Sequence, residues 1–119
     1  MGEILCSTGA LIGKANNRNY RLLEDLSKKL TCDGFEFMMY GSWYEEADGI
    51  VRTVQEMKLN IPVVHCEKHI GESVSAGDFK EACRLLEINC DMASRLGAKK
   101  LVLHLWNGTI SDSNFANNI

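Results

Sequence analysis

Two histidines in this sequence stand at the ends of short apolar segments. His65 follows Ile61–Val64, and His104 follows Lys100–Leu103. An imidazole can donate a hydrogen bond, accept one or coordinate a metal through its ring nitrogens. Each histidine could therefore belong to the packed core, ligate a metal or form one wall of an active site, and all three alternatives stay open at this point.

A carboxylate lies inside another apolar segment. Glu36 occurs in "GFEFMMY", residues 34–40. An unpaired charge inside an apolar strand is costly, so this carboxylate needs a cation, a hydrogen-bonded ligand or solvent. A buried ion pair and a ligand-binding role both satisfy that requirement.

The segments that must position these side chains alternate between two patterns. Short apolar runs predict strands, and apolar residues at helical spacing predict helices. The predicted strands are 3–8, 34–40, 61–66 and 100–105, and the predicted helices are 17–30, 43–59 and 78–96. Strands that alternate with helices over short loops form parallel sheets with right-handed crossovers. The expected fold is therefore α/β, a parallel βαβαβαβ arrangement in a single domain spanning 1–119.

Helix boundaries have signals of their own. Ser42 with Glu45, and Asp78 with Glu81, have the spacing of capping boxes, in which a side chain and a backbone N–H at each position bond reciprocally. Gly97 is expected to end the helix 78–96, because glycine readily takes the left-handed conformation there.

The polar residues singled out above lie near the carboxyl ends of the predicted strands. Ligands bind at the carboxyl ends of parallel strands. The run Cys6-Ser7-Thr8, Glu36, His65 and His104 all lie in or just after predicted strands. Together they favour a binding site on this rim.

The composition narrows the classes of function. The chain has 119 residues, a net charge of −3, and five cysteines. An acidic chain argues against a nucleic-acid surface, and no apolar stretch is long enough to predict a membrane span. The cysteines show no Cys-x-x-Cys spacing, and no secretory signal is recognised, so we expect reduced thiols and a cytoplasmic location.

Three segments resemble one known family. "CDGFEFMMY", "IPVVHCEKHIGES" and "ASRLGAKKLVLHLWNG" are similar to the first half of the xylose-isomerase-like TIM barrels. These include the sugar phosphate isomerases and epimerases and the related endonuclease IV type of repair enzyme. The matching features are Asp33-Gly34-Phe35-Glu36, His65, and Leu96-Gly97-Ala98 followed by His104 and Gly108. They occur in the family's order and cover nearly the whole chain.

The resemblance implies an N-terminal half of a (β/α)8 barrel, since four strands are predicted where a barrel has eight. It implies a metal-assisted isomerase or epimerase acting on a sugar or sugar phosphate. The divalent ion (Zn, Mn, Mg or Co) would be held mainly by the other half, which would also carry the main acid and base. The residues expected to contact substrate are Glu36, His65, His104 and Trp106.

Other interpretations remain. In an endonuclease IV-like protein, His65 and His104 would be metal ligands completed by the other half, although the acidic chain favours the isomerase. A small α/β binding domain without catalysis is the alternative from another class. As a fragment that ends in the helix after its fourth strand, the chain is expected to be nearly inactive alone, to bind metal weakly, and to form a homodimer through exposed sheet edges.

Overall fold

The computed structural model describes residues 2–105, which form a four-stranded parallel sheet. Its strands are β1 (Leu5–Ser7), β2 (Gly34–Met38), β3 (Val63–His65) and β4 (Lys100–Val102). Neighbours in the sheet are neighbours in the chain, in the order β1-β2-β3-β4. The predicted α/β class with a parallel sheet is confirmed. Each strand is shorter than its predicted segment, and 103–105 lie beyond the end of β4.

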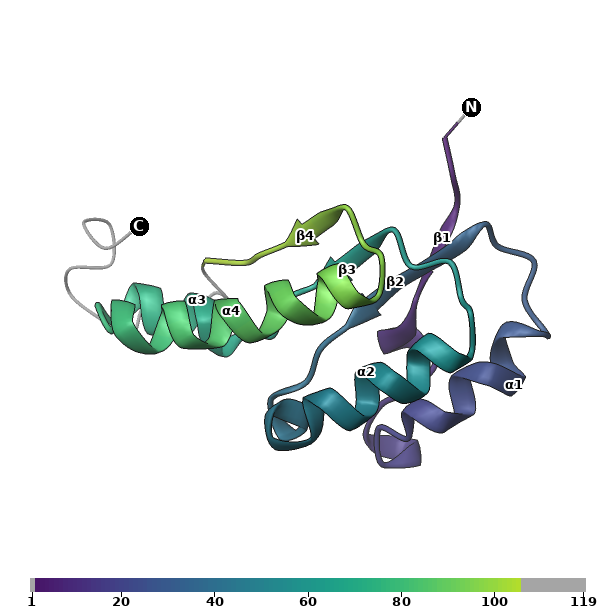
Figure 1. Cartoon of the computed structure of the whole chain (residues 1–119), viewed down its shortest axis with the longest axis horizontal. Coiled ribbons are helices and arrows are strands. Elements are labelled where there is room, and N and C mark those ends of the chain that lie inside the picture. The colour runs from purple at the N-terminus through teal and green to yellow at the C-terminus, as the bar shows by residue number, and fades with distance from the viewer. Residues whose placement is uncertain (1, 106–119) are drawn as a thin grey trace.

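The helices lie on one side of this sheet (Figure 1). They are α1 (Leu23–Ser27), α2 (Ala47–Glu56), α3 (His69–Ser75) and α4 (Phe79–Arg95). When successive parallel strands are added in one direction, right-handed crossovers return every helix on the same face. The opposite face of the sheet is therefore left without helices among the described residues.

The burial of β2 follows from this one-sided cover. Phe35 and Phe37 are 5% and 0% exposed, whereas Glu36 between them and Met38 after them are only partly buried. Alternate residues of a strand point to opposite faces. The two phenylalanines therefore point to the helices, and the glutamate points to the uncovered face. The remaining core on the helix side includes Ile50, Val51, Val54, Val64 and Met92.

An aromatic cluster closes the carboxyl end of β2. Trp43 is 5% exposed and packs edge-on against Tyr40, with ring centroids 4.9 Å apart. It also contacts Phe37 at 5.9 Å and Tyr20 at 5.8 Å. Trp43 thus joins the loop after β2 to the core.

The first predicted helix is wrong at its start. Asn17 and Arg18 have φ values of 57° and 50°, in the left-handed region, so a right-handed helix cannot run through them. The chain re-enters helical geometry only after Asn19, whose side chain accepts the N–H of Arg21. A 3-10 turn, Tyr20–Leu22, leads into the short α1, in place of one helix over 17–30.

The predicted capping box at Ser42 is also wrong, whereas Asp78 caps a helix as predicted. Residues Gly41–Glu46 form a 3-10 helix, and α2 begins after it at Ala47 with no side-chain cap. The tight turn brings Trp43 into the core, so packing overrides the local signal. The Asp78 carboxylate accepts the N–H of Glu81, 3.2 Å away. The Glu81 carboxylate pairs with Arg84 rather than returning to the cap.

The predicted end of α4 agrees with the structure, whereas a further helix, α3, has no counterpart among the predicted elements. Gly97, which follows the C-cap residue Leu96 of α4, has φ +81°, and this confirms the predicted helix end. Helix α3 was not predicted. Its residues include glycine and serines, which are weak helix formers, and it is held by packing against α4 and by burial of Ile70.

Two phenylalanines of different burial test which side chains form the core. Phe37→Ala removes a fully buried ring and is expected to lower the free energy of unfolding by about 3 to 5 kcal/mol. Phe79→Ala removes a ring that is 51% exposed and should cost less than about 1 kcal/mol. Urea unfolding followed by circular dichroism measures both. Equal losses would contradict this assignment of the core.

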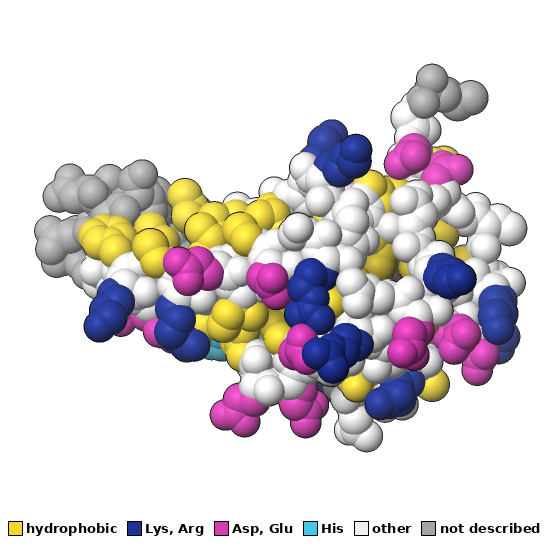
Figure 2. Space-filling view, viewed as in Figure 1, with side chains coloured by type: hydrophobic (Ala, Val, Ile, Leu, Met, Phe, Trp, Pro, Cys, Tyr) yellow, Lys and Arg dark blue, Asp and Glu magenta, His cyan; other side chains and the backbone are white. Residues whose placement is uncertain are grey.

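Self-association stays a prediction, and the surface near β4 offers a way to test it. Leu101, Leu103 and Leu105 are 39%, 38% and 37% exposed, and apolar side chains gather over this end of the molecule (Figure 2). Because β4 is an edge strand within residues 2–105, these leucines border an unpaired edge.

Light scattering across a dilution series should show a mass above that of the monomer, and Leu103→Lys should lower it. Leu30→Lys is the control, since Leu30 is equally exposed, at 37%, but follows α1. A wild-type monomer at micromolar concentration, unfolding independently of concentration, would contradict the prediction.

Candidate functional site

Glu36 and His65 meet on the uncovered face of the sheet. In the register of β2 and β3, Glu36 lies opposite Val63, so His65 is two residues further along β3 and points to the same face. His65 Nδ1 and Glu36 Oε1 are 3.2 Å apart. Their side chains are 21% and 29% exposed, so the pair is sheltered but reachable from solvent.

His104 completes this group. Its ring stacks on that of His65, with centroids 4.9 Å apart and planes at 25°. The chain after β4 passes close to α3, and a Cβ on Gly71 would collide with the carbonyl oxygen of His104. Glycine at this position therefore lets the segment carrying His104 approach. The structure brings together three of the four residues predicted to contact substrate, and Trp106 lies outside the described residues.

The hydrogen bond between Glu36 and His65 restricts the imidazole. An ionised carboxylate can only accept, so the proton of a neutral His65 must lie on Nδ1. Its Nε2 then has a free lone pair and can accept a hydrogen bond or a proton. A carboxylate that orients an imidazole in this way can serve in hydroxyl binding or proton transfer.

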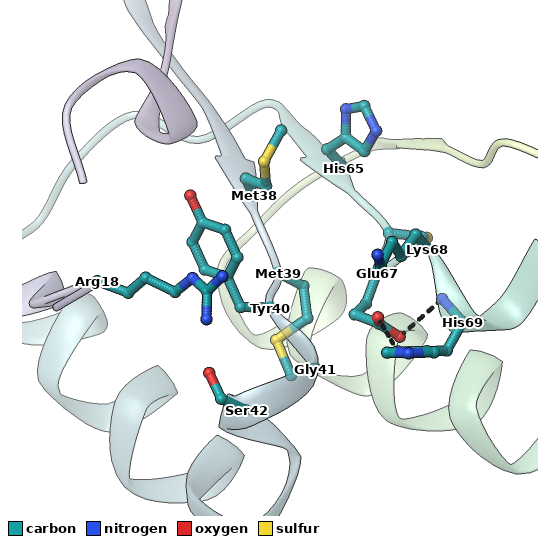
Figure 3. Close-up of a pocket in the computed structure, with 11 residues that line it drawn as sticks. Arg18, Met38, Met39, Tyr40, Gly41, Ser42, His65, Glu67, Lys68 and His69 are labelled. Atoms are coloured by element: carbon teal, nitrogen blue, oxygen red, sulfur yellow. Dashed lines mark hydrogen bonds and ion pairs between the residues drawn. The ribbon is translucent and has the colours of Figure 1, made fainter. Parts of the chain in front are cut away.

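A pocket of about 510 Å³ opens beside this pair, at the carboxyl ends of β2 and β3 (Figure 3). Its polar lining includes Arg18, Tyr40, Ser42, His65, Lys68 and His69. The volume is typical of pockets that take small molecules. Of the residues predicted from the sequence, only His65 lines the pocket directly.

Arg18 reaches the pocket from a loop that the sequence did not single out. Its guanidinium carbon lies 4.9 Å from the centroid of the Tyr40 ring. Tyr40 is fixed in turn, because its hydroxyl donates to the carbonyl of Ile12 at 2.7 Å. Burial raises the pKa of Tyr40, against the opposing charge of Arg18, so the phenol stays neutral.

A buried polar network supports the opposite wall. The Glu67 side chain is 3% exposed. Its Oε2 accepts the Tyr44 hydroxyl at 2.9 Å and the backbone N–H of His69 at 3.0 Å. Asn89 Nδ2 donates to the Tyr44 oxygen at 3.0 Å, and Asn89 Oδ1 accepts the N–H of Glu67 at 3.2 Å.

The same network positions the His69 ring, whose Nδ1 contacts Glu67 Oε1 (Figure 3). The histidine spacing 65–69 could draw attention to His69, but nothing local pairs Glu67 with Tyr44 or with Asn89. These contacts join the loop after β3 to η4 (Gly41–Glu46) and to α4.

The polar run Cys6-Ser7-Thr8, which spans the end of β1 and the first residue after it, has structural roles. Thr8 is fully buried, and its hydroxyl oxygen accepts the N–H of Met38 at 2.8 Å. Ser7 accepts the N–H of Gly9 at 3.2 Å and caps the short turn that follows. Two of the three residues of this run therefore hold β1 to β2 and shape the loop.

The thiol in the pocket wall is poorly suited to nucleophilic chemistry. Burial, assisted by the nearby Cys90, raises the pKa of Cys66 to about 11. The thiolate is the nucleophilic form of cysteine. Cys66 therefore stays protonated near neutral pH.

The positions of the possible ligand side chains limit metal binding in this part of the chain. Within residues 2–105, no group of three or more His, Cys, Asp or Glu side chains is placed to hold a metal ion. His65 and His104 thus lack a third ligand of these types in that part of the chain. Over the same range, no helix has both the length and the apolar character to cross a membrane.

Comparison of the chain with protein-family models, curated proteins and solved structures found no match.

A single hydroxyl tests the buried network. Tyr44→Phe leaves Asn89 Nδ2 and Glu67 Oε2 each without one partner, and should lower the free energy of unfolding by about 1 to 3 kcal/mol. Tyr20→Phe is the control, because its hydroxyl makes no hydrogen bond with other residues in the described range. Urea unfolding measures both variants.

The pH dependence gives a second readout of the same hydroxyl. Burial, with a smaller contribution from Glu67 and against the hydrogen bond from Asn89, raises the pKa of Tyr44 well above 10. Above about pH 10 the unfolded chain ionises this phenol while the folded chain keeps it neutral, so stability falls as pH rises. The fall should be shallower in Tyr44→Phe. An unchanged slope would show that Tyr44 is not the group responsible.

Proposed function

We propose that this chain forms the substrate-binding first half of a (β/α)8 barrel that isomerises or epimerises a sugar or sugar phosphate. The observation that carries the proposal is the meeting of Glu36, His65 and His104 on the helix-free face of the sheet. In a barrel, the corresponding face is the interior, and the carboxyl ends of its strands form the active-site mouth.

The topology supports this proposal over a doubly wound fold. A doubly wound sheet reverses its strand order and carries helices on both faces. Here the order is sequential, and the helices lie on one face (Figure 1). The strand arrangement is therefore compatible with one wall of a barrel.

The polar groups suit a polyhydroxyl ligand. Glu36 can accept hydrogen bonds from hydroxyl groups through the carboxylate oxygen that does not face His65. His65 Nε2 can accept a hydroxyl proton, and the stacked His104 ring adds a flat surface beside it. Isomerisation next to a carbonyl needs a proton to be moved between adjacent atoms. A carboxylate or an imidazole can accept and return such a proton.

In the proposed parent enzyme, a bound divalent ion would polarise the substrate oxygens. The described residues do not supply a complete set of ligands for it. The ion would need ligands from outside residues 2–105, and the binding chemistry above does not depend on it.

Binding of neutral sugars tests the proposal. Titration of the labelled protein with D-ribulose or D-xylulose, followed by NMR, should shift the signals of Glu36, His65 and His104. Glu36→Gln should weaken binding about 10-fold, because it replaces a charged acceptor. Glu24→Gln is the control, since Glu24 is exposed in the first turn of α1.

Two results would contradict the proposal. One is the absence of any sugar-dependent shift on the uncovered face. The other is submicromolar zinc binding that is lost in the His65→Ala, His104→Ala double variant, which would favour an endonuclease IV-like metal site.

A further inference from the structure

Within residues 2–105 Arg18 has no acidic partner, whereas three other arginines form ion pairs. Arg52, Arg84 and Arg95 pair with carboxylates between 2.6 and 3.4 Å away. Arg18 lines the pocket, and its Nε atom is buried without a hydrogen-bond partner among residues 2–105. A buried donor without a partner is costly, so its retention calls for an explanation.

The backbone around Arg18 fixes its position at some conformational cost. Both Asn17 and Arg18 are left-handed, which is unfavourable for residues other than glycine. The N–H of Arg18 donates to the carbonyl of Gly13 at 2.7 Å. Asn16 braces the same loop, accepting the N–H of Gly13 and donating to the carbonyl of Leu11, both at 2.9 Å. Several bonds thus impose a conformation that directs Arg18 at the pocket.

The side chain is held as firmly as the backbone. The guanidinium lies over the Tyr40 ring, and that ring is fixed by Ile12 and by Trp43. An arginine over an aromatic ring can still present N–H donors to a ligand from the edge of its guanidinium. Figure 3 shows Arg18 beside Tyr40, across the pocket from Glu67 and His69.

The carboxylate in the pocket wall is already engaged. Glu67 is buried, accepts hydrogen bonds from Tyr44 and from the backbone of His69, and contacts the His69 ring. Lys68 lines the same pocket and adds a second positive charge. The lining is therefore rich in cationic and donor groups, and its carboxylate is directed away from Arg18.

We propose that Arg18 is an anion subsite of this pocket and binds the phosphate or carboxylate group of the ligand. This assignment rests on the proposed function for the other end of the ligand, whose hydroxyl groups would lie near His65. The planar fork of a guanidinium matches phosphate and carboxylate oxygens through paired hydrogen bonds. Binding supplies the acidic partner that the Arg18 guanidinium lacks among residues 2–105, and the substrate class becomes an acidic sugar derivative rather than a neutral sugar.

The test compares four probes on the same protein: D-ribulose phosphate, D-ribulose, D-ribonate and inorganic phosphate. Calorimetry measures affinity, and the NMR signal of the Arg18 Nε–H reports contact with the anion. The variants are Arg18→Gln, which removes the charge, and Arg18→Lys, which keeps it without the fork. Arg21→Gln is the matched control, because Arg21 also lies over a tyrosine, Tyr20 at 5.4 Å, but does not line the pocket.

The proposal predicts that the sugar phosphate or the sugar acid binds at least 10-fold more tightly than D-ribulose. Arg18→Gln should weaken binding of the anionic ligand about 10- to 100-fold and leave D-ribulose unchanged. Arg18→Lys should retain part of the preference, and Arg21→Gln all of it. Preference for D-ribulose phosphate or for D-ribonate decides between phosphate and carboxylate.

Other outcomes separate the two proposals. Equal affinity for D-ribulose and both anionic sugars would overturn the anion subsite and leave the proposed function standing. Phosphate binding that depends on Arg18, with no response to any sugar, would support the subsite and overturn the proposed function. Equal weakening of neutral and anionic ligands in Arg18→Gln would mean that Arg18 only supports Tyr40, and would overturn the subsite. If Arg18→Gln fails to fold, the affinities of the wild-type protein and its Arg18 Nε–H signal decide.

Discussion

The one-sided cover of the parallel sheet is the constraint on which the rest of this structure depends. The strands follow one another in chain order, and right-handed crossovers then return every helix to the same face. That face takes the large apolar side chains, such as Phe37 and Val64, which are fully buried. The other face has no helix to pack against within residues 2–105, so polar side chains can stand on it without a large desolvation cost. Glu36 and His65 occupy this face, one residue away from core residues on their own strands.

The loops at the carboxyl ends of the strands add the pocket beside this pair, and they do so by long-range contacts. The loop after β1 places Arg18 over Tyr40, and the loop after β3 places Glu67 against His69 at the start of α3. Further residues hold both contacts in place. Trp43 packs against Tyr40, and Asn89 and Tyr44 belong to the hydrogen-bond network around Glu67. The sheet fixes where the strands end, and these supporting contacts determine which side chains face the pocket. The two walls of the pocket therefore differ in charge. As far as residues 2–105 go, one wall carries the cation of Arg18 without an acidic partner, and the other carries a carboxylate, Glu67, that is already hydrogen-bonded.

The sequence predicts those features of the structure that depend on the periodicity of apolar residues and on strand register. Apolar runs located all four strands, and the period of two along β2 and β3 explains why Glu36 and His65 share a face. The sequence does not predict the features that depend on packing between segments distant along the chain. Local spacing predicted a helix through Asn17 and Arg18 and a cap at Ser42, but the Gly13 carbonyl and the burial of Trp43 override both. Asn89 falls at helical spacing from Leu85 on the buried side of α4, and only its partners on other elements explain a polar residue there. The half-barrel, its metal and its substrate rest on resemblance and stay predictions.

We propose that this protein binds its ligand on the helix-free face, at the carboxyl ends of β2 and β3. A crystal structure of the protein with D-ribulose or D-ribulose phosphate bound tests this most directly. Ligand hydroxyl groups are expected within hydrogen-bond distance of Glu36 and His65, with any anionic group at Arg18. A ligand bound among the helices, or on the uncovered face without contact to Glu36 or His65, would contradict it.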